Sequence, residues 1–298
     1  LKTLGADTLI CFPPVHPKSA RLLVDEAQDL WHLVAKTNIK RVVIVSSAEV
    51  YGPRPHNIGY LPETRPRSYS GRNEIAQSWV DYEERAERTF ASTQLVILRP
   101  ASVLVKNGSG FFCQLFGRRL GITLPGHDPT LQLLSVDDLV GAICAVIGKD
   151  VTGIFNVAPD GVVTLRGAFA ISGTKRLPVP RPIQGPLRRR PADQLEYVRF
   201  AWTVSNQKLK DLVGFQPKHS SVDALLGFLR KENTGKQGNL GHQRVFDDYG
   251  LDTGYVESYR RTLFQFLSRV YWRIEHRGIE NIPTEGRAVL TGVHRGLM

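Results

Sequence analysis

The apolar residues of this chain fall into short continuous runs and into longer runs with helical spacing. Residues 42–45 are all β-branched and lead directly into Ser46 and Ser47. Apolar residues at consecutive positions predict a strand buried on both faces, as in a parallel sheet. Two similar runs occupy residues 7–12 and 94–100. The two serines would lie at the carboxyl end of their strand, where open α/β sheets place ligands, although simple termination of the strand also explains them.

Between these runs, apolar residues recur at spacings of three and four. The spacing predicts helices over residues 25–37 and 74–90, and an apolar segment over residues 139–147 predicts another. Residues 64–73 are polar and predict a surface loop. Strands that alternate with helices indicate an α/β fold, a doubly wound parallel sheet of the Rossmann type.

The chain changes character after residue 230. Residues 231–241 are polar and contain glycine, which is typical of a linker. Residues 255–276 predict an amphipathic helix that also carries arginines. Such a helix either lies on a membrane surface or packs on its own domain, and the sequence leaves both interpretations open.

The net charge of +11 is partly concentrated in one proline-rich stretch. Its basic residues are Lys175, Arg176, Arg181, Arg188, Arg189 and Arg190. A solvated loop is the simplest interpretation, and binding of phosphate groups, anionic lipid or nucleic acid is the alternative. No helix-turn-helix or aromatic-interleaved basic pattern supports nucleic acid as a partner.

The cysteines and the absence of long apolar runs indicate a cytoplasmic protein. Cys11, Cys113 and Cys144 lie far apart in apolar surroundings, which favours buried free thiols over a metal or redox site. No apolar run approaches the ~18 residues of a membrane span, and no signal pattern opens the chain. The chain begins with Leu1 and its single methionine is Met298, so we expect a piece of a longer protein.

The segment that starts at Ser46, SSAEVYG, resembles the S-S-x-x-V-Y-G strand ending of the extended short-chain dehydrogenase/reductase family, the nucleotide-sugar epimerases and dehydratases. Further resemblances follow in the family's order over residues 4–230: DTLICF, QLVILRP, LQLLSVDD and GIFNV. The resemblance implies that Ser47 hydrogen-bonds the reacting substrate oxygen. It also implies cofactor contacts at Phe12, Pro13, Ser46, Arg99 and Pro100, with NAD or NADP as the cofactor and a dimer formed through the two helices before residue 91.

The family's glycine-rich loop, G-x-x-G-x-x-G, does not occur in this sequence. In the family that loop holds the cofactor pyrophosphate at a helix start. We therefore expect cofactor binding by these residues alone to be weak or absent, whatever the full-length parent does.

The family's catalytic Tyr-x-x-x-Lys is also missing. Alignment of the second helix on its Ala-Glu pair places Trp79 at the tyrosine position and Glu83 at the lysine position. A tyrosine and a lysine four residues apart share one helix face, so that the ammonium can lower the pKa of the phenol. Tyr82 and Arg85 are candidate substitutes under a shifted alignment, but their spacing of three turns the arginine in another direction.

The end of the chain resembles a different family, the glycerophospholipid acyltransferases. The segments GIENIP, GRAVL and VHRG precede the end in the order of that family's opening, and His294 matches the histidine of its N-H-x-x-x-x-D motif. The resemblance implies that His294 takes a proton from the acceptor hydroxyl, a base that an aspartate would orient. The sequence given ends before that aspartate.

We therefore expect three parts: an epimerase/dehydratase-like domain over residues 1–230, a linker over 231–254 and the start of an acyltransferase domain over 255–298. The first hypothesis is an NAD(P)-dependent domain for a sugar or lipid-linked small molecule that has lost its catalytic pair. The alternative is a cofactor-sensing or substrate-positioning module of an acyltransferase. Expected partners are the small-molecule substrate, a second copy of the chain and a membrane surface reached through the helix at residues 255–276.

Overall fold

The computed structural model describes residues 6–15, 22–67, 74–106, 108, 110–179 and 193–233. The chain divides into two compact units, residues 1–236 and 237–298, and the second lies wholly outside the described residues. The predicted helix at residues 255–276, His294 and the basic residues Arg181 and Arg188–Arg190 fall outside them as well.

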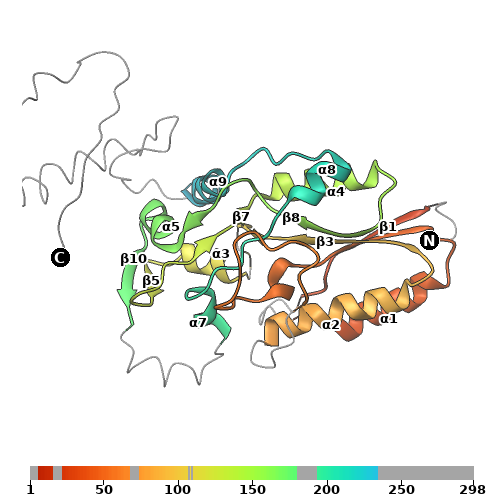
Figure 1. The fold of residues 1–298 in the computed structure, drawn as a ribbon, viewed down its shortest axis with the longest axis horizontal. Coiled ribbons are helices and arrows are strands. Elements are labelled where there is room, and N and C mark those ends of the chain that lie inside the picture. Colours follow the sequence, from red (N-terminus) through yellow and green to blue (C-terminus); the bar gives the residue numbers. More distant parts are fainter. Residues whose placement is uncertain are drawn as a thin grey trace, which may run out of the picture. The chain divides into compact units, whose positions relative to one another are not determined.

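A parallel four-stranded sheet forms the centre of the first unit (Figure 1). Its strands lie in the order β1 (Thr8–Cys11), β2 (Arg41–Val45), β3 (Gln94–Pro100) and β8 (Gly153–Val157). All three pairings are parallel. All five residues of β2 are buried, as its continuous apolar run predicts.

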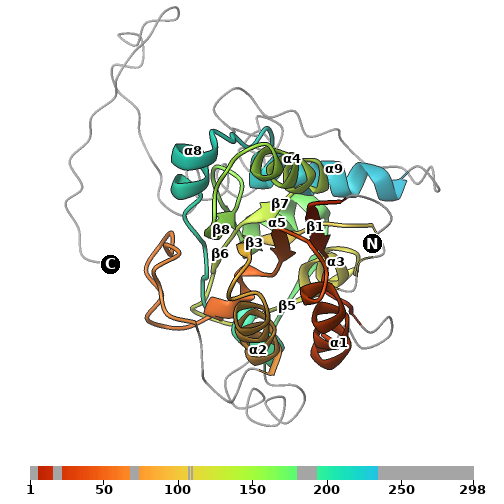
Figure 2. The same ribbon diagram turned by 90° about the vertical axis from the view of Figure 1, so that its right-hand side faces the viewer.

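Helices cover both faces of this sheet. Helices α1 (Val24–Ala35) and α2 (Glu74–Thr89) lie on one face, and α4 (Val136–Ile147) and α8 (Gln207–Val213) lie on the other (Figures 1 and 2). Successive side chains of a strand point to opposite faces, so β2 contributes to two separate cores. Val42 and Ile44 pack in the core on the α1 and α2 side, whereas Val43 and Val45 pack in the other. The doubly wound α/β fold that the sequence predicts is confirmed.

Shorter elements complete the unit. They are η1 (Ala48–Tyr51), β4 (Ser102–Val103), α3 (Phe111–Phe116), β5 (Leu120–Thr123), β6 (Thr130–Leu131), β7 (Leu133–Leu134), β9 (Val163–Thr164), α5 (Leu165–Ser172), β10 (Lys175–Pro178), α7 (Asp193–Tyr197) and α9 (Ser221–Asn233). Helix α9 therefore continues three residues into the predicted linker. Among the residues that the structure describes, no helix is both long and apolar enough to cross a bilayer.

Two expectations from the sequence are wrong. Lys175 and Arg176 do not lie in a loop, because they open strand β10, which pairs with β5. Cys144 is exposed, whereas Cys11 and Cys113 are buried as predicted. Cys144 lies on the outer side of α4, since the buried apolar positions of that helix are Ala142, Ile143 and Val146.

Candidate functional site

Ser46 and Ser47 lie at the carboxyl end of β2, as predicted, but they make different contacts. The Ser46 backbone N–H extends the strand pairing by donating to the Leu98 carbonyl at 2.8 Å. Ser47 is the N-cap of η1, and its Oγ accepts a hydrogen bond from the Glu49 N–H at 3.1 Å. This contact uses a lone pair of the Ser47 hydroxyl and leaves its hydrogen free to be donated to a ligand.

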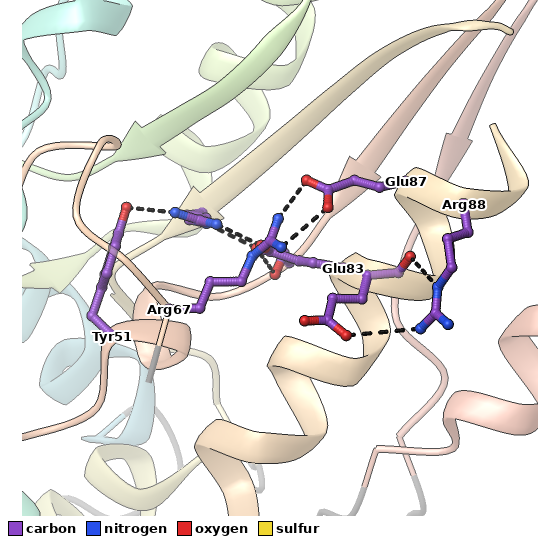
Figure 3. A network of polar contacts seen from close by, with 8 residues as sticks. Tyr51, Arg67, Glu83, Glu87 and Arg88 are labelled. Atoms are coloured by element: carbon purple, nitrogen blue, oxygen red, sulfur yellow. Dashed lines mark hydrogen bonds and ion pairs between the residues drawn. The ribbon is translucent and has the colours of Figure 1, made fainter. Parts of the chain in front are cut away.

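Glu83 lies at the centre of a buried polar network (Figure 3). The Arg99 guanidinium donates to both of its carboxylate oxygens, at 2.9 and 2.6 Å. Ser46 Oγ donates to the same carboxylate at 2.6 Å, and Arg67 Nε donates at 2.7 Å. A carboxylate with these partners has most of its acceptor positions filled, and the guanidinium groups of Arg99 and Arg67 balance its negative charge.

The network continues from Arg99 toward β8. Arg99 Nη1 donates to the Tyr51 hydroxyl at 2.7 Å, and that hydroxyl donates to Asn156 Oδ1 at 3.0 Å. Burial opposes the charged form of Arg99, but the hydrogen bonds and the charge of Glu83 outweigh it and raise the pKa of Arg99. Burial likewise raises the pKa of Tyr51, against the opposing effect of Arg99. Both side chains therefore keep their protons at neutral pH.

Arg67, in the described part of the predicted surface loop, turns its side chain into the protein. Its side chain is only 14% exposed and bridges Glu83 to Glu87, with which it forms two further hydrogen bonds. Burial disfavours the charged guanidinium, yet Glu87 and Glu83 raise its pKa. Polar residues in a loop predict solvent exposure on average, but they give no sign of a buried partner on a distant helix.

Glu49 is a site residue that the sequence analysis missed. Its Oε2 accepts a hydrogen bond from Trp79 Nε1 at 3.2 Å. Burial raises its pKa to about 7, and hydrogen bonds from Trp79 and Tyr197 oppose that rise. A carboxyl that titrates near neutrality, two residues from Ser47, can donate or accept a proton under physiological conditions. Its position inside the segment SSAEVYG could have drawn attention to Glu49, but its raised pKa depends on contacts with distant segments of the chain.

The suggested substitutes Tyr82 and Arg85 do not come together. Tyr82 is fully buried and packs against Trp31 with ring centroids 4.8 Å apart, in the core between the sheet and α1. Arg85 instead forms an ion pair with Asp25 of α1, at 2.6 Å. The spacing of three directs these side chains to different surroundings, as the helical geometry predicts. Burial, the largest cause, also raises the pKa of Tyr82, which opposes any role as a base.

The positions predicted to contact a cofactor fit one only in part. Phe12, at the end of β1, is 61% exposed, and Pro13 follows it, so this edge can meet a ligand. Pro100 is buried beside Arg99, whose guanidinium is already bound to Glu83 and Tyr51. Under the alignment suggested by the sequence, Glu83 falls at the position where the family has a ribose-binding lysine. Arg99 is therefore occupied within the protein, whereas the exposed Phe12 is accessible to a ligand.

Two other features carry no chemistry at this site. An open groove of about 590 Å³ is lined by Phe90, Leu95 and Ile154. It lies at the amino ends of β3 and β8, whereas Ser47 follows the carboxyl end of β2. In the described part of the chain, no three metal-ligating side chains are grouped so that they could hold an ion.

Comparison with known sequences supports the resemblance. Residues 23–158 match the NAD dependent epimerase/dehydratase family. An uncharacterized protein of Mycobacterium tuberculosis (strain ATCC 25618 / H37Rv) is 28% identical over 213 residues, which cover 65% of this chain and 54% of that protein. A second uncharacterized protein of that strain is 32% identical over 77 residues, 26% of this chain and 20% of its own length. The chain spans about half the length of the first of these relatives.

Solved structures of low sequence identity share the fold. MoeE5 in complex with UDP-glucuronic acid and NAD has a TM-score of 0.59 at 16% identity, covering 77% of this chain and 80% of that one. UDP-glucuronic acid 4-epimerase from Bacillus cereus in complex with NAD has a TM-score of 0.57 at 13% identity, covering 76% and 75%. The human epimerase family protein SDR39U1 with NADPH has a TM-score of 0.59 at 16% identity, covering 76% and 82%. These likenesses confirm a Rossmann-like fold of the epimerase type.

Proposed function

We propose that residues 6–233 form an epimerase/dehydratase-type domain that binds a nucleotide sugar or lipid-linked sugar and does not catalyse hydride transfer by the family's tyrosine and lysine. The proposal rests on the hydrogen-bond partners of the Glu83 carboxylate. Under the alignment suggested by the sequence it takes the lysine position, and its carboxylate is bound by Ser46, Arg67 and Arg99. A carboxylate at this position cannot replace the ammonium of a lysine, which would bind the ribose and lower the pKa of a neighbouring phenol.

The residues left to meet a ligand are Ser47 and Glu49. The Ser47 hydroxyl has a hydrogen to donate, and Glu49 can donate or accept according to pH. A sugar hydroxyl both donates and accepts hydrogen bonds, so this pair suits it. One structural neighbour is a complex with UDP-glucuronic acid and NAD, and another is a UDP-glucuronic acid 4-epimerase, which supports a nucleotide sugar as the ligand class. A nicotinamide cofactor, when bound, would supply the hydride acceptor of the family's chemistry, and Phe12 and Pro13 are the residues placed to touch it.

The test is calorimetry on the full-length protein with UDP-glucuronic acid, NAD(H) and NADP(H) as probes, beside an assay of hydride transfer by nicotinamide absorbance. We expect binding of the nucleotide sugar, a loss of at least tenfold in Ser47→Ala, and no turnover. Ser205→Ala is the matched control, because Ser205 Oγ accepts the Gln207 N–H as Ser47 accepts that of Glu49. Turnover that the double replacement Tyr82→Phe with Arg85→Ala abolishes would overturn the proposal.

The second candidate is a substrate-positioning or cofactor-sensing module for an acyltransferase. Its support is the resemblance of the segments GIENIP, GRAVL and VHRG to the opening of the acyltransferase family. His294 is the expected base of that reaction, and residues 255–298 are the expected start of the acyltransferase domain. Acyl transfer by the full-length protein to a glycerol phosphate acceptor, abolished in His294→Ala, would support this candidate.

Exposed leucines on α1 support self-association. Leu30 and Leu33 are 54% and 65% exposed on the helix that packs against α2. Two large apolar side chains on one exposed helix suit a second copy of the same surface. Light scattering of the full chain should show a homodimer that Leu30→Asp with Leu33→Asp converts to a monomer.

A further inference from the structure

Strands β5 and β10 form a two-stranded parallel ribbon outside the main sheet (Figure 1). Leu120 is paired with Lys175, and Ile122 with Leu177. Paired residues of a ladder point to the same side, so these four side chains share one side of the ribbon. The intervening Gly121 faces α5, because a Cβ at that position would lie 2.4 Å from the Phe169 ring. The side that carries the leucines therefore faces away from α5.

On this side Ile122 is half-buried and packs against the main core, whereas the two leucines are exposed. Leu120 is 57% exposed and Leu177 is 51% exposed. Large apolar side chains on a short strand usually pack under another layer, and neither of these is covered. Two such leucines on neighbouring strands make a small apolar surface that can be buried by a partner.

Basic residues surround the two leucines. Arg118 and Arg119 come immediately before Leu120, and Lys175 and Arg176 come immediately before Leu177; all four are exposed. Lys175 shares the side of the leucines, whereas Arg176 is paired with Gly121 and lies on the other side. Within the residues that the structure describes, none of the four forms an ion pair with a carboxylate. The sequence has no acidic residue between Glu87 and Asp128, nor between Asp160 and Asp193, so no acid adjoins them along the chain.

We propose that this basic ribbon, formed by Arg118, Arg119, Leu120, Lys175 and Leu177, is a docking surface for anionic phospholipid. The basic side chains would contact lipid phosphates, and the leucines would enter the interfacial layer of the bilayer. The proposal depends neither on the predicted helix at residues 255–276 nor on the sugar site at Ser47.

A membrane surface fits these residues better than a nucleic acid does. Both partners offer phosphates to basic side chains. Single-stranded nucleic acid is usually also bound by aromatic side chains on which its bases stack, and residues 118–123 and 175–178 contain no aromatic residue. Exposed leucines gain little from bases, whereas they gain the apolar environment of acyl chains.

Flotation of the full chain with vesicles is the direct test. Vesicles of phosphatidylcholine alone are compared with vesicles that contain about one third phosphatidylglycerol. We expect binding to the anionic vesicles only, weakened by salt, because each basic residue near such a surface adds attraction that salt screens. Arg118→Glu with Arg119→Glu should weaken binding by about a hundredfold. Leu120→Ser with Leu177→Ser should weaken it by about tenfold at high salt, where the apolar contribution dominates.

Controls separate this surface from other basic parts of the chain. Lys36→Glu with Lys40→Glu makes the same change of charge at exposed positions near the end of α1 and should leave binding unchanged. All substituted residues are exposed, and an unchanged thermal midpoint of each variant would show that the fold is retained. Binding that survives the ribbon substitutions but is lost in Arg269→Glu with Arg273→Glu would overturn the proposal. So would ribbon-dependent binding to a single-stranded oligonucleotide at lower concentration than to the vesicles.

Discussion

Arg99 and Glu83 form a two-pronged ion pair inside the protein, with hydrogen bonds of 2.9 and 2.6 Å between side chains that are 2% and 0% exposed. One partner comes from the end of β3 and the other from the middle of α2, so the pair joins the sheet to the helix that covers it. Under the alignment that the sequence suggests, Glu83 also falls at the position of the family's lysine, on which the proposed loss of hydride chemistry depends.

Removing the charge of Glu83 should destabilise the protein strongly. Glu83→Gln leaves the buried guanidinium of Arg99 without its anion, and breaking a buried pair in this way costs about 3–5 kcal/mol. Urea unfolding measures the loss. Glu84→Gln is the matched control, since Glu84 lies next along α2 and its ion pair with Arg88, at 3.7 Å, is partly exposed; we expect less than about 1 kcal/mol there. Equal effects of the two substitutions would contradict the described burial of Glu83.

Glu49 should make the stability of the protein depend on pH. Its pKa is about 7 in the folded protein, against an ordinary value of 4.5. The folded state therefore holds this proton more tightly than the unfolded state. The stability that the protonated group contributes is complete below about pH 4.5 and is lost as the pH rises to about 7. One pKa unit corresponds to about 1.4 kcal/mol, so the loss is at most about 3 kcal/mol.

Glu49→Gln should remove that dependence. The neutral amide cannot ionise, so the variant should gain stability relative to the parent between pH 5 and pH 8, by up to about 3 kcal/mol in urea unfolding. Glu26→Gln, on the exposed side of α1, controls for the loss of one carboxylate. A difference between parent and variant that stays constant over this range would show that Glu49 does not titrate as described.

The fold was predictable from the sequence because its signals are local. The residues of β2 and β3 are apolar at consecutive positions, and α2 has the three-and-four spacing of a covered helix, so their bounds agree closely with the structure. Ser46 and Ser47 were placed correctly at a strand end for the same reason. The ribbon of β5 and β10 was missed because its short strands lie about 50 residues apart and pair only in three dimensions.

The site was less predictable because its properties arise between distant residues. Arg67 reaches Glu83 across 16 positions, and nothing in its own neighbourhood in the sequence indicates a buried partner. The pKa of Glu49 depends on burial and on contacts with Trp79 and Tyr197. The spacing of Tyr82 and Arg85 correctly indicates that they point apart, because the relative direction of two side chains on one helix depends only on their spacing.

The three cysteines should react at very different rates. Cys144 is exposed, whereas Cys11 and Cys113 are buried, and burial raises the pKa of Cys11 to about 11 and also raises that of Cys113. Because the thiolate is the reactive form, a disulfide reagent should modify one thiol rapidly in the native protein and the other two only on unfolding. Cys144→Ser should abolish the rapid phase. A rapid phase that persists in this variant would contradict the described burial.

Gly121 should tolerate no side chain, because it is the point at which the ribbon meets α5. An added Cβ would lie 2.4 and 2.5 Å from two atoms of the Phe169 ring, and that ring is 1% exposed, so it cannot swing into solvent. Overpacking of this kind costs about 1–3 kcal/mol, although alanine in a strand is otherwise favoured over glycine by about 0.5–1 kcal/mol. Gly121→Ala should therefore unfold at lower urea concentration than the parent. Gly148→Ala is the control, since the nearest atoms to its Cβ would lie at 3.7 Å and its φ of −74° suits alanine. If Gly121→Ala proved as stable as Gly148→Ala, β5 could not lie against Phe169, and the outward direction of Leu120 and Leu177 would lose its basis.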